Sequence, residues 1–286
     1  MKTESEIKNT LLKIQSYASS LTKAEATVAN YVISNSKDVI YLSITDLAEK
    51  ADVGETTVLR FCRKLGFRGF QDFKLSLAQD QVQPASDLHE EVMENDDAAT
   101  LVKKIVSSLS RGMEETRDLL DPKKLEKAIQ MIVKAKNVHF YGVGSSGVTA
   151  AEAAHSFTRI GKSCDAKQDT HFQAISASLM SEDDVAVGFS ISGSTKDTND
   201  NLKIAKDRGA YIICVTHNAR SPITKISDVD LLMSAKENPL QGSSLLARIS
   251  QLAIVDILCT GVSMQMKETA IKYRERTAKA VSEKFY

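Results

Sequence analysis

Apolar residues recur at intervals of three and four over residues 4–80, which is the period of amphipathic helices. No part of this stretch shows the two-residue alternation of a strand. Thr22 precedes the second apolar stripe, and its hydroxyl suits a helix N-cap. The pattern therefore predicts an all-helical segment. The first stripe is Leu11, Leu12, Ile14 and Tyr17, and the second is Val28, Tyr31, Val32 and Ile33.

Two short helices joined by a tight turn are predicted next. Residues 43–51 follow a helical pattern that Ser43 punctuates at its start, and the pattern stops at residues 52–54, which end in Gly54. A second helix follows over residues 55–65, with apolar positions at Val58, Leu59, Cys62 and Leu65. Ala48 is small enough for close helix packing, and Val53 can plug the turn. This layout is typical of a helix-turn-helix DNA-binding module.

The second short helix places short polar residues at its start and cations further along. We expect its outward face to carry Glu55 and the candidate DNA contacts, because polar side chains can read base edges and cations can bind phosphates. Residues 55–78 hold five basic and two acidic residues, a difference of plus three. That charge is modest, so DNA affinity would need a dimer that presents two copies. The candidate DNA contacts are Thr56, Thr57, Arg60, Arg63, Lys64 and Arg68.

A cluster of cations on a short helix can also be a solvated face without a partner. The turn, together with Ser43 and Gly54, favours the DNA-binding interpretation. Phe67, Phe70 and Phe73 are expected to pack in a further helix as core residues rather than to stack on bases.

An acidic stretch separates this segment from the rest of the chain. Residues 79–102 contain no Lys or Arg, seven acidic residues and Pro84. Such a composition is typical of a domain boundary, and its charge would be repelled by DNA. We therefore expect a DNA-binding domain over residues 1–79, a linker over 80–97 and a second domain over 98–286.

Strands and helices alternate in the second domain. Two helices are expected first, over residues 100–120 and 122–136, with Asp121 as the cap of the second and Pro122 at its first position. The alternation that follows predicts a five-stranded parallel sheet flanked by helices on both faces. A long helix over residues 242–266 and a polar one over 267–284 end the chain. The expected strands are 138–141, 163–166, 184–189, 211–216 and 229–232.

Two of the expected strands end in loops that suit an anion. The first loop, residues 142–147, reads GVGSSG, and the second, residues 190–195, reads SISGST. Glycines let the backbone approach a ligand, free N–H groups of a helix's first turn favour negative charge, and hydroxyls donate to phosphate oxygens. Such loops emerge at the carboxyl ends of parallel strands, so we expect both to face one phosphate.

A dinucleotide site is a rival interpretation. Gly142, Gly144 and Gly147 satisfy G-x-G-x-x-G after a strand, and Asp165 lies where an acid that binds ribose would sit. This pattern alone is weak, and it leaves the second loop without a role.

GVGSSG followed by S-x-S-G-x-T within five alternating strands resembles the sugar isomerase (SIS) domain, which binds phosphosugars. Preceded by a helical DNA-binding segment, the chain resembles the RpiR family of bacterial transcriptional regulators over residues 5–265. The segment ITDLAEKADVGETTVLRFCRKLGFRGFQDFK is similar to that family's DNA-reading module, and RISQLAIVDIL, residues 248–258, to its late helix.

The resemblance implies a role for particular residues. Ser145, Ser146, Ser190, Ser192 and Thr195 are expected to hold the phosphate, and Gly144 and Gly193 to give it room. Glu237 could equally be an acceptor for sugar hydroxyls or an exposed loop acid, and His171 is a weaker candidate for the sugar end. The expected effector is a phosphorylated sugar; the family suggests amino-sugar 6-phosphates such as N-acetylmuramic acid 6-phosphate, and no residue selects one.

The resemblance also raises the alternative of a sugar-phosphate isomerase. Arabinose-phosphate isomerases that resemble this domain carry a lysine where this chain has Ser145, so a positive charge is missing here. Glu152, His155 and His171 could serve as acid or base, but no pair stands out. We therefore expect binding of double-stranded operator DNA and of a sugar phosphate by a homodimer or homotetramer, without catalysis.

Amino-acid composition bears on three further questions, which are nucleic-acid binding, metal binding and cellular location. The chain has 286 residues, 42% hydrophobic and 26% charged, with a net charge of zero, so only a local patch can attract nucleic acid. Four scattered cysteines have no metal-ligand spacing and are expected to be reduced thiols, so we expect neither a metal nor a cofactor. The N-terminus lacks a signal peptide pattern, and no apolar run is as long as a membrane helix, so we expect a cytoplasmic protein.

Overall fold

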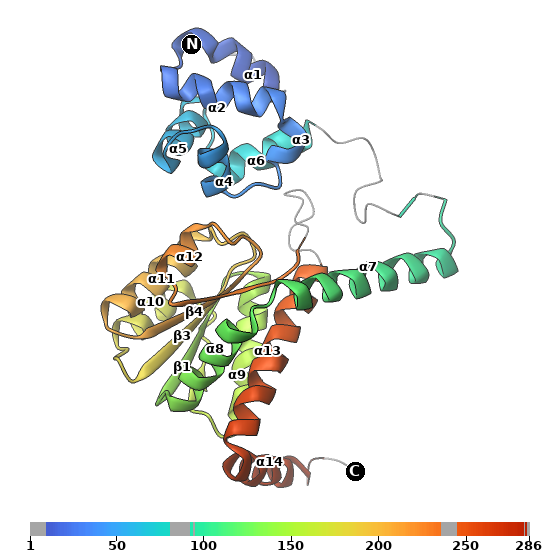
Figure 1. Cartoon of the computed structure of the whole chain (residues 1–286), viewed down its shortest axis with the longest axis vertical. Coiled ribbons are helices and arrows are strands. Elements are labelled where there is room, and N and C mark those ends of the chain that lie inside the picture. Colours follow the sequence, from blue (N-terminus) through green and yellow to red (C-terminus); the bar gives the residue numbers. More distant parts are fainter. Residues whose placement is uncertain (1–9, 81–91, 94, 236–244, 283, 285–286) are drawn as a thin grey trace. The chain divides into compact units, whose positions relative to one another are not determined.

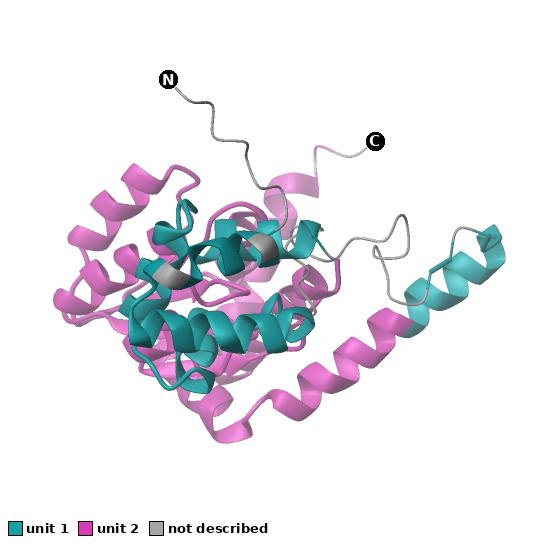
Figure 2. Cartoon of the chain, turned by 90° about the horizontal axis from the view of Figure 1, so that it is seen from above, with its two compact units in different colours: residues 1–107, 236–244 teal, residues 108–235, 245–286 magenta. Residues whose placement is uncertain are grey.

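A computed structural model describes residues 10–80, 92–93, 95–235, 245–282 and 284. The chain divides into two compact units, one of residues 1–107 with 236–244 and the other of residues 108–235 with 245–286 (Figure 2). The helices of residues 10–80 are called the head below, and the second unit is called the sheet unit. The predicted linker over residues 80–97 lies mostly outside the described residues, so the predicted domain borders stay predictions.

The head is helical throughout, as predicted. Thr22 and Glu25 form a reciprocal capping box at the start of α2, and Ser43 and Asp46 form another at the start of α4. Phe61 packs edge-on against Phe73 in the centre, with ring centroids 5.7 Å apart. The elements are α1 (Thr10–Tyr17), η1 (Ala18–Ser20), α2 (Lys23–Ser34), α3 (Ser36–Val39), α4 (Ile44–Lys50), α5 (Glu55–Lys64) and α6 (Phe70–Gln79).

The turn between α4 and α5 lies where predicted, but its residue with a left-handed backbone conformation is not the glycine. Asp52 has φ 50°, in the left-handed region, whereas Gly54 has φ −80° and is the N-cap of α5. The N–H of Val53 donates to the carbonyl of Ala48 over 2.8 Å, and both side chains pack in the head's core. The turn therefore depends on an aspartate in the left-handed conformation.

Two helices lead into the sheet. α7 (Ala98–Leu119) is followed by α8 (Pro122–Lys134), which begins as predicted: Asp121 Oδ1 accepts from the N–H of Lys123 over 2.8 Å, and Pro122 takes the first position. α8 ends two residues before the predicted boundary.

The sheet has five parallel strands in the order β2-β1-β3-β4-β5, which confirms the prediction. β1 pairs with β2 on one side and with β3 on the other, so the strand order reverses at this point. β2 is shorter than predicted and has only two residues. The strands are β1 (Asn137–Tyr141), β2 (Cys164–Asp165), β3 (Asp184–Phe189), β4 (Tyr211–Thr216) and β5 (Val229–Leu232).

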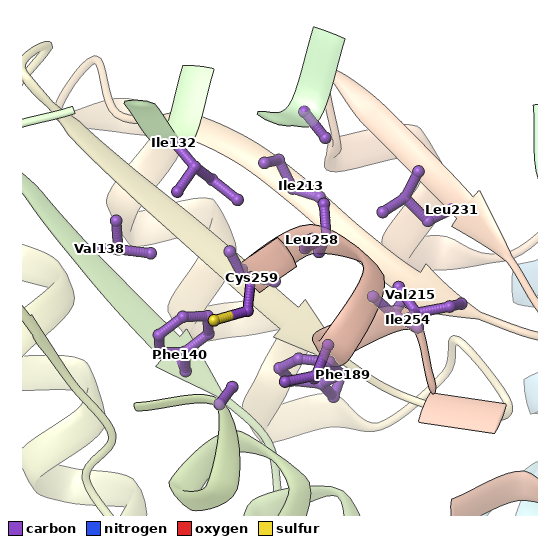
Figure 3. Packing of buried hydrophobic residues seen from close by; sticks show 14 of the residues in the cluster. Ile132, Val138, Phe140, Phe189, Ile213, Val215, Leu231, Ile254, Leu258 and Cys259 are labelled. Atoms are coloured by element: carbon purple, nitrogen blue, oxygen red, sulfur yellow. The ribbon is translucent and has the colours of Figure 1, made fainter. Parts of the chain in front are cut away.

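Helices cover both faces of the sheet (Figure 1). All six residues of β3 are buried, with Val187 facing one apolar core and Ala186 the other. Figure 3 shows the larger core, where Ile132 of α8 and Ile254 and Leu258 of α13 meet the strands. The remaining helices are α9 (Ser145–Arg159), α10 (Thr170–Ser178), α11 (Lys196–Asp207), α12 (Pro222–Ile226), α13 (Leu245–Gln265) and α14 (Lys267–Ser282).

α13 is the most apolar helix of the described chain. By length and composition alone it could cross a membrane, but 44% of its apolar window is buried inside the protein. Ala247, Ile254, Leu258 and Val262 supply that buried side, which packs on the sheet. The apolar character of α13 is therefore partly explained by the core.

Candidate functional site

The two predicted loops lie beside each other at one edge of the sheet. They follow β1 and β3, which are parallel neighbours with Tyr141 aligned on Gly188. Neighbouring strands are about 5 Å apart, so the loops start at the same level and at that separation. Because the strand order reverses between β1 and β3, this is the switch point where α/β sheets bind ligands.

Two glycines of the first loop disfavour a side chain, Gly142 for lack of space and Gly144 because of its backbone conformation. A Cβ on Gly142 would lie 2.5 Å from the carbonyl oxygen of Ser146. Gly144 has φ 60° and ψ −129°, a conformation that L residues rarely adopt, and it is the N-cap of α9. Ser145 and Ser146 are the first two residues of α9, so their N–H groups have no acceptor four residues earlier within the helix. The loop therefore presents free amides at a helix N-terminus, as predicted.

The hydroxyl of Ser146 points into the protein. Ser146 is buried, and its Oγ accepts from Nε2 of Gln251 on α13 over 3.1 Å. Gln251 is itself fully buried and accepts from the hydroxyl of Thr149 over 3.0 Å. Ser145 is half-exposed. Of the two adjacent serines, Ser145 has the hydroxyl that is available to a ligand, whereas Ser146 can offer its N–H.

The second loop is held by hydrogen bonds among its own residues. Ser190 Oγ and Thr195 Oγ1 lie 3.0 Å apart, and the N–H of Ser194 donates to Ser192 Oγ over 3.2 Å. Gly193 has φ 66°, and a Cβ there would lie 2.2 Å from Ser221 Oγ. Ser192 and Thr195 are half-exposed, whereas Ser190 is buried at 1% exposure. The loop thus presents Ser192 and Thr195 to solvent. Gly193 lies between them in a tight turn, and α11 begins directly after the loop.

A buried amide network joins the supports of both loops. Gln173 of α10 is fully buried, and its Nε2 donates to the carbonyls of Gly142 over 2.9 Å and Lys167 over 2.8 Å. Its Oε1 accepts from Nδ2 of Asn201 on α11 over 3.1 Å. Sequence reasoning missed Gln173 and Asn201. The only available signal was an amide on the inward stripe of each helix, which is weak by itself.

The remaining predicted ligand residues are less informative. His171 is exposed at the second position of α10. Glu237 lies outside the described residues. Residues 142–147 and 190–195 contain no charged side chain, so an anion there would be bound by neutral donors.

The DNA-binding candidates on α5 fall into two groups. Thr56, Arg60 and Arg63 are exposed, as is Arg68 just after the helix. Thr57 was predicted on the outward face, but the residue is buried at 8% exposure, with its Oγ1 3.5 Å from Nη2 of Arg60. Lys64 is half-buried, and its Nζ lies 2.9 Å from Glu25 Oε2 of α2.

Comparison with known proteins agrees with this architecture. A family model described as "Helix-turn-helix domain, rpiR family" matches residues 8–84, and the SIS domain model matches residues 131–261. A transcriptional regulator of the helix-turn-helix type from Haemophilus influenzae is 38% identical, covering 96% of this chain and 97% of its own length. The chain belongs to the RpiR family of transcriptional regulators.

Two further relatives extend the match. The transcriptional regulator HexR of Pseudomonas aeruginosa is 32% identical, covering 91% of this chain and 90% of its own. The solved structure of the Vibrio vulnificus NanR protein, complexed with ManNAc-6P, is 29% identical with a TM-score of 0.84, and covers 97% of this chain and 99% of that one. The predicted fold and family are therefore confirmed.

Asp165 of this RpiR protein does not offer a free carboxylate to a ribose. Its Oδ1 lies 3.1 Å from His139 Nδ1, and its Oδ2 lies 3.1 Å from Lys167 Nζ. These contacts, the one with His139 first, hold the pKa of Asp165 below its ordinary value. A dinucleotide would have to displace both partners, which weakens the rival interpretation.

The acid and base candidates of the RpiR chain lie away from the loop ends. Glu152 and His155 are exposed on α9, with Glu152 Oε1 3.6 Å from His155 Nδ1. Glu152 is seven residues beyond Ser145, roughly 10 Å along the helix axis. Neither side chain lies in the two loops.

Proposed function

We propose that this transcriptional regulator senses a phosphorylated sugar at the β1–β3 switch point and alters its affinity for operator DNA in response. The observation that carries the proposal is the pair of neutral, donor-rich loops at adjacent strand ends, in a chain that also bears a helix-turn-helix head. The protein binds the sugar phosphate without converting it, and its relatives' names as transcriptional regulators support this role.

The phosphate site combines hydroxyls and backbone amides. Ser145, Ser192 and Thr195 donate through their hydroxyls, and the N–H groups of Ser145 and Ser146 add the charge preference of a helix N-terminus. Ser190 is buried beside Thr195, so it orients that hydroxyl or joins it on the phosphate. Glu237 is proposed as an acceptor for a sugar hydroxyl.

An amino-sugar 6-phosphate is the first class of effector to test. The support is the similarity of nearly the whole chain to NanR, whose structure holds ManNAc-6P. At 29% identity, this similarity makes the class a starting point for a screen that also covers other hexose phosphates.

A dimer or tetramer would present pairs of α5 helices to operator DNA. The protein would act in the cytoplasm, where the chromosome lies. The domains are residues 1–79 and 98–286, joined by residues 80–97. A sugar phosphate can shift the equilibrium only if it binds one arrangement of the heads better than the other, and a coupling of about 1–3 kcal/mol is typical.

The test is a thermal-shift screen of the full chain with ManNAc-6P, N-acetylmuramic acid 6-phosphate, glucose 6-phosphate and inorganic phosphate, followed by operator binding with each hit. We expect one sugar phosphate to raise the melting temperature and change DNA affinity, and the double variant Ser192→Ala, Thr195→Ala to lose both effects. A chain that binds operator DNA but responds to no sugar phosphate would refute sensing. Formation of a ketose from an aldose phosphate would instead show an isomerase.

A further inference from the structure

A buried threonine of α7 joins three segments of the sheet unit. Thr116 is 2% exposed, and its Oγ1 lies 2.8 Å from the carbonyl oxygen of Gly112, one turn earlier in the helix. The same Oγ1 lies 3.1 Å from Ser250 Oγ of α13, and it accepts from the N–H of Ser234 over 3.1 Å. A threonine hydroxyl has one proton and two lone pairs, so these three contacts use it fully. Thr116 therefore links α7 to α13 and to the segment that follows β5.

The contact with α13 leads to the first loop. Ser250 is fully buried, and the next residue, Gln251, donates to Ser146 Oγ over 3.1 Å. α7 also packs closely on α13 at this level, since a Cβ on Gly112 would lie 2.2 Å from Cδ1 of Leu246. Two hydrogen bonds and one peptide unit therefore connect Thr116 to the loop that follows β1.

The segment after β5 leads in the same way to the second loop. The amide nitrogen of Ala235 lies 3.1 Å and the carbonyl oxygen of Met233 lies 3.0 Å from Nδ1 of His217, so the ring bonds this segment in either tautomer. His217 follows β4, and its own N–H donates to the carbonyl oxygen of Ile191 in the second loop over 3.0 Å. The supports of both proposed phosphate loops thus meet at Thr116.

α7 also extends beyond the sheet unit. The helix runs without a break from Ala98 to Leu119, whereas the division between the two compact units falls between residues 107 and 108 (Figures 1 and 2). Residues 98–107 therefore belong to the unit that contains the head, and Thr116 belongs to the sheet unit. Among the described elements, α7 is the helix that crosses this division. A change in the hydrogen bonds at Thr116 acts directly on this helix.

We propose that Thr116 is a positioning residue that couples occupation of the phosphate site to operator binding. The inference rests on the proposed function, in that a sugar phosphate must alter operator affinity. It goes beyond that function by naming the side chain through which the change is carried. The sugar phosphate has only to favour one arrangement of the hydrogen bonds at Thr116 over another.

The test measures operator affinity of the full chain with and without the sugar phosphate that the thermal-shift screen selects, starting with ManNAc-6P. The ratio of the two affinities is typically about 5–150 for coupled sites. Thr116→Val keeps the shape of the side chain but removes the hydroxyl, so the ratio should fall close to one while the sugar phosphate still raises the melting temperature. Thr116→Ser keeps a hydroxyl at this position and should keep the wild-type ratio.

Thr158→Val is the matched control. Thr158 Oγ1 also donates to the carbonyl oxygen four residues earlier, that of Ala154, over 2.7 Å, and its other contact is Cys164 Sγ. The control therefore removes the same kind of helix bond without touching the junction at Thr116, and it should keep the wild-type ratio. Ser250→Ala is a milder second variant, because it removes one contact of Thr116 and leaves the N–H of Ser234 bonded. It should lower the ratio without abolishing it.

The outcomes separate this inference from the proposed function. A wild-type ratio in Thr116→Val would overturn the inference, and so would a loss of sugar-phosphate binding in that variant, which would show a structural role. If Thr116→Val does not fold, Ser250→Ala decides, and a wild-type ratio there overturns the inference. A wild-type chain whose operator affinity no sugar phosphate changes would refute the proposed function itself, and the inference with it.

Discussion

Gln173 holds the first loop from beneath, through a hydrogen bond of 2.9 Å from its Nε2 to the carbonyl oxygen of Gly142. The same side chain bonds Asn201 of α11, the helix that begins where the second loop ends. A single buried amide thus connects the first loop to the helix that follows the second loop.

Replacing Gln173 by methionine should destabilise the sheet unit and weaken sugar-phosphate binding. The change keeps the length of the side chain but leaves the carbonyl of Gly142 and the amide of Asn201 without their partner, at a cost of about 1–3 kcal/mol. Urea unfolding measures the stability, and calorimetric titration measures the affinity. Ile175→Gln, on the exposed side of the same helix, is the control and should stay within about 0.5 kcal/mol of the wild type.

The two left-handed glycines of the site should differ in their tolerance of alanine. Gly144→Ala meets no atom within 4 Å, so it carries only backbone strain, roughly 1–3 kcal/mol. Gly193→Ala adds a clash with Ser221 Oγ, 2.2 Å from the new Cβ, and Ser221 is fully buried. We expect Gly193→Ala to lower the urea midpoint further. Equal midpoints would contradict the packing described for the second loop.

Glu25 should make the stability of the head depend on pH. The N–H of Thr22 and then the ammonium of Lys64 hold the pKa of Glu25 below its ordinary value of 4.5. The carboxylate therefore stabilises the folded head above pH 4.5, and this contribution is lost as the pH falls through the lower folded-state pKa. Glu25→Gln should cost roughly 1 kcal/mol at neutral pH.

The pH profile of this variant is the diagnostic measurement. The gap between wild type and Glu25→Gln in unfolding free energy, followed by circular dichroism, should shrink as the pH is lowered below 4.5. A gap that is constant with pH would show that the charge of Glu25 does not matter.

The exposed arginines of α5 should act on DNA alone. Arg60→Ala with Arg63→Ala should weaken operator binding and reduce the slope of log affinity against log salt by about 0.9 for each phosphate that the variant no longer neutralises. The thermal shift with a sugar phosphate should stay as in the wild type. Lys272→Ala, an exposed cation of α14 in the sheet unit, is the control for a general charge effect. Loss of both activities in the arginine variant would indicate misfolding instead.

Periodicity and punctuation in the sequence predicted most of the fold. All five strands were found, Thr22 and Asp121 cap helices where predicted, and Ser43 marks the start of α4, because each signal acts within a few residues. The ends of α8 and β2 were predicted less well, since hydrogen bonding to distant segments decides where an element stops.

Side-chain direction at the site was harder to predict. Ser145 and Ser146 are neighbours in one motif, yet only the second is bonded to Gln251, which lies 105 residues away. Thr57 lies in the polar start of α5, yet the residue is only 8% exposed in the folded head. Both outcomes depend on tertiary contacts that no local pattern contains.

Gln251 and Leu252 are consecutive residues of α13 whose side chains lie on different sides of the helix surface, one buried and one exposed. The first is fully buried and bonds Ser146 in the turn where the phosphoryl group is proposed to bind, and the second is 38% exposed on the outer side of the helix. Both residues belong to one uninterrupted helix of 21 residues. One peptide bond therefore separates a residue that supports the proposed phosphate site from a residue on the outer surface of the sheet unit.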